Sequence, residues 1–270
     1  MTDVTPSPAS LLVDIGANLT HGSFDADRVE VIARARAAGV GRFVVTGSDV
    51  EHSRKALDLC ARDPALYATA GVHPHHAKDV TPTTDDELRG LLNHSRVVAV
   101  GECGLDYFRN FSPAEIQRRV FEMQLGLARD CGKPAFLHQR DAHADFMRIL
   151  AAHRPGLSKA VVHCFTGDAA ELKDYLSLDC HVGITGWICD ERRGRHLREC
   201  VRLIPADRLM LETDAPYLIP RDLSPRPASH RNEPMHLKHI AKVVAGCLDK
   251  PFEQLIRETT AVAEAFFGLG

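Results

Sequence analysis

The sequence has little of several features that would place it in a special class of protein. Its 270 residues hold eight cysteines, none of them in a Cys-x-x-Cys pair, so we expect reduced thiols rather than a disulfide framework. No apolar run approaches the length of a membrane span. The first residues lack the basic start and the apolar segment of a signal peptide. We therefore expect a cytoplasmic protein that does not contact a membrane.

The chain also has no excess of positive charge. Its net charge is -3 and its pI is near 6.6, which excludes a surface that is basic throughout. Any contact with nucleic acid must then be local, in a cationic groove. The hydrophobic fraction of 44% and the charged fraction of 26% are ordinary for a soluble globular protein.

Short apolar runs alternate with helical patterns along the whole chain. The predicted strands start at Leu11, Arg42, Leu66, Val98, Ala135, Ala160, His181 and Leu209. The predicted helices are Asp25–Ala38, Val50–Ala61, Pro82–Leu92, Ser112–Gly132, Ala142–Ala152, Ala169–Leu178, Glu191–Leu203, Glu233–Cys247 and Pro251–Phe267. This alternation predicts an α/β protein with a single (β/α)8 TIM barrel.

An open, doubly wound sheet is the alternative fold. No Gly-x-Gly-x-x-Gly segment follows the first predicted strand, which argues against the dinucleotide-binding version of that sheet. We assign residues 10–270 to the barrel and residues 1–9 to a flexible N-terminal tail.

Four of the predicted strands end in a side chain that can bind a metal ion. These side chains are Glu102, His138, His163 and Asp214. In a TIM barrel the carboxyl ends of the strands meet at one face, so these groups would lie together. Two carboxylates and two imidazoles suit Mg²⁺, Mn²⁺ or Zn²⁺. The sequence therefore predicts a divalent metal site.

Other residues after strand ends are candidates for contacts with a substrate. His73 follows the third strand and would stabilise a leaving group or a phosphoryl oxygen. Arg109, Arg140 and Arg221 would clamp phosphates through bidentate contacts. Trp187, the only tryptophan, would stack a base. Each also has a structural interpretation, as a loop histidine, a solvated arginine or a packed aromatic side chain.

Seven segments in a fixed order make the pattern more specific. They are Asp14–Thr20, Gly71–His75, Gly101–Asp106, Phe136–His143, Val162–Gly167, Glu212–Leu218 and Arg231–Pro234. Together they resemble the TatD-type metal-dependent deoxyribonucleases, which are relatives of the amidohydrolase barrels. The resemblance covers almost the whole chain.

The resemblance implies a nuclease that cleaves phosphodiester bonds, as a 3′-to-5′ exonuclease on single-stranded DNA and possibly on RNA. It also implies that Glu102, His138 and His163 bind one metal ion, and that Glu102 and Asp214 face a second. A cation is needed because a phosphodiester anion repels hydroxide. Asp214 would accept the proton of the attacking water or bind the second cation. Glu102 and His73 complete the predicted catalytic set.

The chain departs from the family in its first strand. Most relatives carry an Asp-x-His-x-His segment there, but this chain has Gly16 and Asn18 at the histidine positions. We therefore expect one firm metal site and a weak second one. Mg²⁺ is the expected ion, with Mn²⁺ and Zn²⁺ as alternatives. Asn18 is assigned to substrate binding.

Two further functions stay open at this point. A hydroxide activated by a metal also attacks carbonyl groups, so an ester or amide hydrolase such as an aminoacyl-tRNA deacylase is one alternative. A barrel that lost one metal site and serves as a binding protein is the other. The sequence points to no protein partner.

Overall fold

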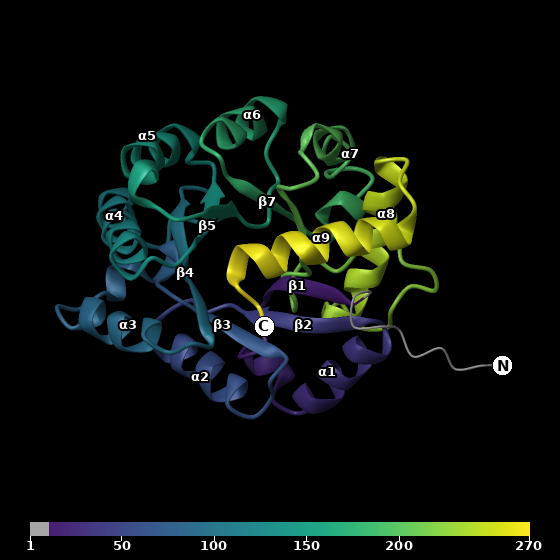
Figure 1. Cartoon of the computed structure of the whole chain (residues 1–270), viewed down its shortest axis with the longest axis horizontal. Helices are drawn as coiled ribbons and strands as arrows, with labels where there is room; N and C mark the ends of the chain where they lie inside the picture. Colours follow the sequence, from purple (N-terminus) through teal and green to yellow (C-terminus); the bar gives the residue numbers. More distant parts are fainter. Residues whose placement is uncertain (1–10) are drawn as a thin grey trace.

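The computed structural model describes residues 11–270, so the predicted tail at residues 1–9 lies outside the described residues. In that part of the chain, eight strands form one sheet in the order β1 to β8, and every pair is parallel. Helices surround the strands (Figure 1). The predicted (β/α)8 barrel is confirmed.

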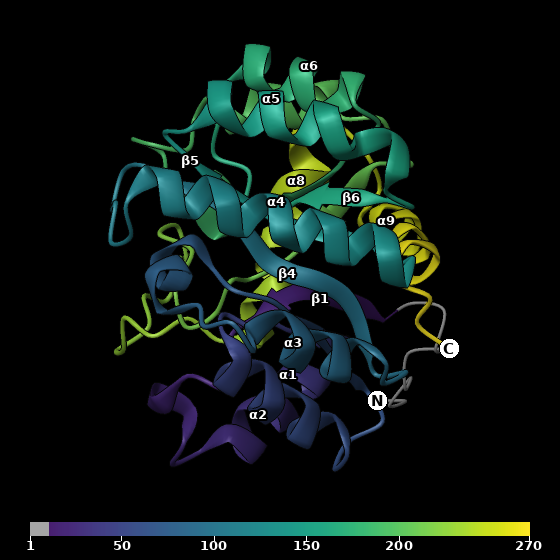
Figure 2. The same cartoon turned by 90° about the vertical axis from the view of Figure 1, so that its left-hand side faces the viewer.

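The bounds of the elements follow the predicted pattern closely. The strands are β1 (Leu12–Ala17), β2 (Val40–Val45), β3 (Leu66–Ala70), β4 (Val97–Asp106), β5 (Ala135–Arg140), β6 (Ala160–Val162), β7 (His181–Ile184) and β8 (Leu209–Leu211). The helices are α1 (Arg28–Ala37), α2 (Val50–Cys60), α3 (Thr84–Leu92), α4 (Ala114–Cys131), α5 (His143–His153), α6 (Ala169–Ser177), α7 (Leu197–Cys200), α8 (Leu237–Cys247) and α9 (Phe252–Phe267). Figure 2 shows α4 crossing the outside of β4.

Hydrogen bonds between the segments that follow β8 and the end of β1 close the barrel. The backbone N–H of Asp214 donates to the carbonyl of Gly16 at 2.8 Å, and that of Asn18 donates to the carbonyl of Ala215 at 2.7 Å. A parallel bridge joins Ala17 to Ala215. The last strand end is thus placed directly beside the first.

The longest strand, β4, positions the candidate site. All ten of its residues are buried, as expected for a parallel strand covered on both faces. The helix that follows, α4, ends at Gly132, which adopts a left-handed φ of 68° and so stops the helix in the usual way. Glu102 is therefore positioned by a strand that is buried along its whole length.

The predicted helix Glu191–Leu203 is wrong in its first half. The backbone N–H groups of Arg192 and Arg193 donate to the carboxylate of Asp190 at 3.0 and 3.1 Å. Such local bonds compete with helix formation. The backbone N–H of Gly194 then donates to the Asp190 carbonyl at 2.8 Å. The chain therefore turns before α7, which is a single short helix.

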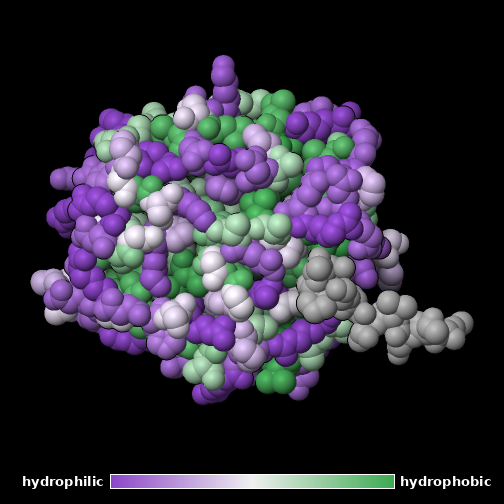
Figure 3. Space-filling view, in the orientation of Figure 1, coloured by the Kyte–Doolittle hydropathy of each residue, from purple (hydrophilic) through white to green (hydrophobic). Residues whose placement is uncertain are grey.

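Helix α9 covers the amino-terminal end of the barrel. Its Phe266 and Phe267 pack in a buried cluster with Val13, Ile15 and Val44 of the strands. Figure 1 shows α9 lying across this end, and Figure 3 shows hydrophobic residues among the hydrophilic ones on the same face. This end is filled by side chains, which leaves the carboxyl ends of the strands as the place for a site.

All eight cysteines lie in residues 11–270 and are free thiols. Within the described chain, no helix combines the length and the apolar character that crossing a bilayer requires.

Stability should depend on pH through His181, the first residue of β7. Its ring lies 4.7 Å from that of Phe266, and its Nδ1 has no hydrogen-bond partner among the described residues. Burial, with the positive charge of Arg208 adding to it, lowers the pKa of His181 from 6.5 to about 4. The unfolded chain therefore takes up this proton first as the pH falls.

We expect the free energy of unfolding to decrease as the pH falls from about 6.5 to about 4, and His181→Gln to remove that part of the decrease. Urea denaturation at several pH values measures this. Parallel pH profiles for the two proteins would show that His181 does not contribute.

Candidate metal centre

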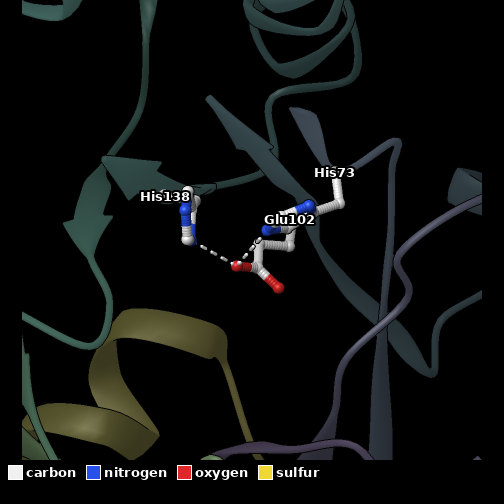
Figure 4. A group of neighbouring side chains, drawn as sticks. All are labelled: His73, Glu102 and His138. Carbon is white, nitrogen blue, oxygen red and sulfur yellow. Dashed lines mark ion pairs between the residues drawn. The ribbon is translucent and has the colours of Figure 1, made fainter. Parts of the chain in front are cut away.

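One carboxylate and three imidazoles meet at the carboxyl ends of β3 to β6. Oε1 of Glu102 lies 2.7 Å from Nε2 of His163, 2.9 Å from Nδ1 of His138 and 3.4 Å from Nε2 of His73. Figure 4 shows His73 and His138 converging on Glu102. The nearest ligand atoms of His73, Glu102 and His138 all lie within 4.8 Å of one another. One ion could be held by such a group.

A second carboxylate, Asp106, lies beside this group. Its Oδ2 is 2.7 Å from Nε2 of His75 and 3.5 Å from Nε2 of His138. Sequence reasoning did not single out Asp106 or His75. The period-two rule could have found Asp106, because residues 102 and 106 of one strand point to the same side.

Glu212 lies on the far side of His163 and was also missed. Its Oε2 is 3.2 Å from Nδ1 of His163, and its Oε1 accepts a hydrogen bond from the backbone N–H of Cys164. A carboxylate in this position fixes the orientation of an imidazole and leaves the opposite nitrogen, Nε2, facing Glu102.

The carboxylate of Glu212 also fills the space beside Gly16. A Cβ built on Gly16 would lie 2.4 Å from Oε2 of Glu212. A side chain at position 16 would therefore collide with Glu212 in its present position. The glycine at position 16 of β1 thus leaves the space that the carboxylate of Glu212, just after β8, occupies.

Asp214 and Asn18 lie together at the same end of the barrel. The amide Nδ2 of Asn18 donates to Oδ1 of Asp214 at 2.9 Å. Burial raises the pKa of Asp214 to about 7, and the negative charges of Glu102 and Glu212 act in the same direction, while the positive charge of His163 opposes them. Asp214 is thus close enough to these carboxylates to feel their charge.

A further buried carboxylate supports the segment that carries Asp214. Oδ1 and Oδ2 of Asp14 accept hydrogen bonds from the backbone N–H and the hydroxyl of Thr213, at 2.9 and 2.5 Å. Burial raises the pKa of Asp14 to about 7. Asp14 thus ties β1 to the chain beyond β8.

Hydrogen bonds indicate which nitrogen of His73 carries a proton. Burial lowers the pKa of His73 to about 4, so its ring is neutral. The backbone N–H of His75 donates to Nδ1 of His73 at 3.1 Å, and the ring proton must then be on Nε2. His73 therefore presents a donor toward Glu102.

The electrostatics of the centre fit a cation. Although burial disfavours the charge of Glu102, His163 and His73 hold the pKa of this carboxyl well below its usual value. Burial likewise disfavours a charged His163, but Glu102 and Glu212 raise its pKa well above the usual value. Positive charge is thus favoured between these carboxylates, and metal binding there would compete with protons. In addition, Nε2 of His138 is buried and makes no hydrogen bond to the described residues.

The arginines and the tryptophan named as substrate contacts fall into two regions. Arg140, the last residue of β5, lies over the ring of Phe108 at 4.0 Å. Arg109, just after β4, lies 5.8 Å from the same ring. Arg221 instead pairs with Asp190, Nε to Oδ2 at 3.1 Å.

Trp187 belongs to the Asp190 region, since the guanidinium of Arg193 lies over its ring at 4.4 Å and also bonds Asp190. Cys189, Asp222 and His239 form another group of potential ligand atoms within 4.8 Å of one another. There the only carboxylate is already bonded to its histidine, Oδ1 to Nε2 at 2.7 Å.

Comparison with known proteins identifies the family of this chain. The family model described as "TatD related DNase" matches residues 13–268. The chain belongs to this family. The resemblance inferred from the seven segments is confirmed.

Individual relatives cover nearly the full chain. A protein of Erwinia amylovora named "3'-5' ssDNA/RNA exonuclease TatD" is 52% identical over 96% of this chain and 100% of its own length. A protein of the same name from Erwinia billingiae is 50% identical over 96% of this chain and 99% of its own length. The crystal structure of a TatD homologue from Escherichia coli superposes with a TM-score of 0.88 at 27% identity, covering 96% of this chain and 99% of that one.

The contact between position 16 and Glu212 can be tested by a double-mutant cycle. We expect Gly16→Ala to lower the free energy of unfolding by about 1–3 kcal/mol, because the new methyl group collides with the buried carboxylate of Glu212. In a Glu212→Ala background the same change should cost less. Urea denaturation measures all four proteins.

Gly126→Ala is the matched control. A Cβ at Gly126 in α4 meets nothing within 4 Å, so this change should stabilise the helix by about 0.5–1 kcal/mol. Equal costs of Gly16→Ala in both backgrounds would contradict the collision.

Proposed function

We propose that this protein is a divalent-metal-dependent nuclease that hydrolyses phosphodiester bonds of single-stranded DNA and RNA from the 3′ end. The observation that carries the proposal is the single oxygen of Glu102 surrounded by nitrogens of His163, His138 and His73. Family membership and the exonuclease names of the two Erwinia relatives support the substrate.

Glu102, His138 and His163 would hold the first cation. His163 has the required arrangement, with Nδ1 directed at Glu212 and Nε2 directed at Glu102. Glu102 and Asp214 would face a second, weaker site. Mg²⁺ is our first choice, with Mn²⁺ and Zn²⁺ as alternatives for a mixed set of imidazole and carboxylate ligands.

A bound divalent cation supplies the positive charge that a phosphodiester anion and an attacking water both need. Asp214 would accept the proton of that water, since its carboxylate is buried beside Glu102 and Glu212 at the same end of the barrel. His73 would donate from Nε2 to the leaving-group oxygen or to a phosphoryl oxygen. Asn18 would keep Asp214 oriented through the 2.9 Å hydrogen bond and contact the substrate.

Arg140 ends β5 and Arg109 comes just after β4, the two strands that carry His138 and Glu102, so we assign the phosphates next to the scissile bond to these two arginines. Arg221 and Trp187 would contact a more distant part of the strand. We further propose that residues 10–270 form one domain and that the protein is cytoplasmic, in keeping with its free thiols.

Activity provides the direct test. With Mg²⁺ or Mn²⁺ the protein should release mononucleotides from single-stranded DNA. Glu102→Ala and His163→Ala should each reduce the rate by more than about 100-fold, since even residues that only support a ligand typically change metal affinity or activity 10–100-fold.

The exposed residues Glu122 and His94 provide matched controls, as Glu122→Ala and His94→Ala should keep full activity. Undiminished activity in both Glu102→Ala and His163→Ala would refute the proposal. Faster hydrolysis of an ester-linked aminoacyl-tRNA than of DNA would favour the deacylase instead.

Calorimetry should resolve the two metal sites. We expect one tight site for Mn²⁺ in the free protein and a second that fills only at much higher concentration, because position 16 offers no side chain and position 18 offers an amide. His163→Ala should weaken the tight site. Two equally tight sites would contradict this expectation.

A further inference from the structure

Exposed aromatic rings gather near the candidate metal centre. Within residues 11–270 the large hydrophobic side chains that remain exposed are Val29, Phe108, Phe111, Leu203 and Tyr217. All three aromatic ones follow strand ends, Phe108 and Phe111 after β4 and Tyr217 after β8. Exposed rings are unfavourable in water, and their gathering at one end of a fold indicates a binding surface.

Phe111 is joined to the centre by a short chain of contacts. Its ring, 56% exposed, lies 4.8 Å from the ring of His75 at an angle of 60°. Nε2 of His75 in turn lies 2.7 Å from Oδ2 of Asp106. Only His75 thus separates the exposed ring from a carboxylate of the centre.

Phe108 combines an aromatic face with positive charge. The ring is 55% exposed, and the guanidinium of Arg140 lies over it at 4.0 Å. Arg140 follows His138 by two residues on β5. A ring beside a guanidinium is the combination that binds a base and its phosphate in proteins that hold single strands.

The loop that carries both rings is held in place from inside. The buried amide of Gln117 donates to the carbonyls of Ser112 and Asp106 at 2.7 and 3.1 Å. The buried hydroxyl of Ser112 donates to the carbonyl of His75 at 3.0 Å. The rings are therefore exposed but positioned before any ligand arrives.

Tyr217 lies on the opposite side of the barrel. In the eight-stranded order, β4 and β8 are four strands apart. The backbone N–H of Tyr217 donates to the carbonyl of Asp214 at 2.9 Å, and its side chain is 52% exposed. The candidate metal centre thus has aromatic side chains on both sides.

We propose that Phe108 and Phe111 form a stacking shelf that binds the nucleobases next to the scissile phosphate, with Arg140 holding the adjoining phosphate. This rests on the proposed function and adds to it a source of selectivity. The faces of a base are covered inside a duplex, and only an unpaired base can stack on a protein ring. The stacking shelf would therefore select single strands.

Binding of a fluorescent oligonucleotide tests the shelf. The probe is a single strand with phosphorothioate linkages, which resist hydrolysis, and 2-aminopurine at its 3′-terminal positions, measured with Mg²⁺ present. The wild-type protein should quench the fluorescence. Phe111→Ala and Phe108→Ala should each reduce the quenching and raise Kd about tenfold.

Three variants separate stacking from general disturbance. Phe111→Trp keeps a ring and should restore the quenching and the affinity. Val29→Ala and Leu203→Ala remove exposed apolar side chains elsewhere and should leave Kd unchanged. Absence of quenching by the wild-type protein, or a Kd of Phe111→Ala within twofold of wild type, would overturn the stacking shelf.

Turnover of an oligonucleotide with abasic 3′-terminal positions distinguishes this inference from the proposed function. Removal of the bases should lower the kcat/KM of the wild-type protein about tenfold. On the abasic substrate, Phe111→Ala should have the same kcat/KM as the wild-type protein. Equal kcat/KM values of the wild-type protein on both substrates would refute the stacking shelf but not the proposed nuclease function. Fluorescence quenching without any release of nucleotides would support the stacking shelf and refute the proposed nuclease function.

Discussion

The arrangement of three imidazole nitrogens around one oxygen of Glu102 is the constraint on which the rest of the site depends. These side chains come from four strands or strand ends, and they meet only because the barrel is closed and β4 is buried along its whole length. A carboxylate this deep is stable as an anion only beside positive charge. The fold therefore creates a place for a cation before any substrate is considered.

Two further carboxylates, Glu212 and Asp106, contact the histidines of the candidate metal centre and orient them. Glu212 orients His163 from behind and occupies the space above Gly16. Asp106 receives His75 and approaches His138. Glu212, which directs Nε2 of His163 toward Glu102, thus also removes room for a side chain at position 16 of β1.

Local patterns predicted the fold and the inner residues well, because a buried strand and the side chain that ends it can both be recognised within a few residues. Glu102, His138 and His163 were found in this way, and the barrel topology implied their meeting. Glu212 follows β8 directly and so has the same local signature, but only Asp214 was selected from that strand end. Asp14 lies inside a buried strand, where a carboxylate that supports another segment has no local signature. The prediction of a helix that begins at Glu191 was wrong because the carboxylate of Asp190 accepts hydrogen bonds from the backbone N–H groups of Arg192 and Arg193.

Loops beyond the strand ends are less predictable than the strand ends, and the aromatic side chains show why. Trp187 and Phe111 both follow strands at the same face, but Trp187 is partly buried against the core while Phe111 is exposed beside His75. The difference arises from contacts between segments far apart in sequence. Asp106, the last residue of β4, points to His75 and His138, whereas Phe108 and Phe111 shortly after it are exposed. The proposed cation and the proposed stacked base would therefore be positioned by the same stretch of backbone. A change in that loop would alter both together.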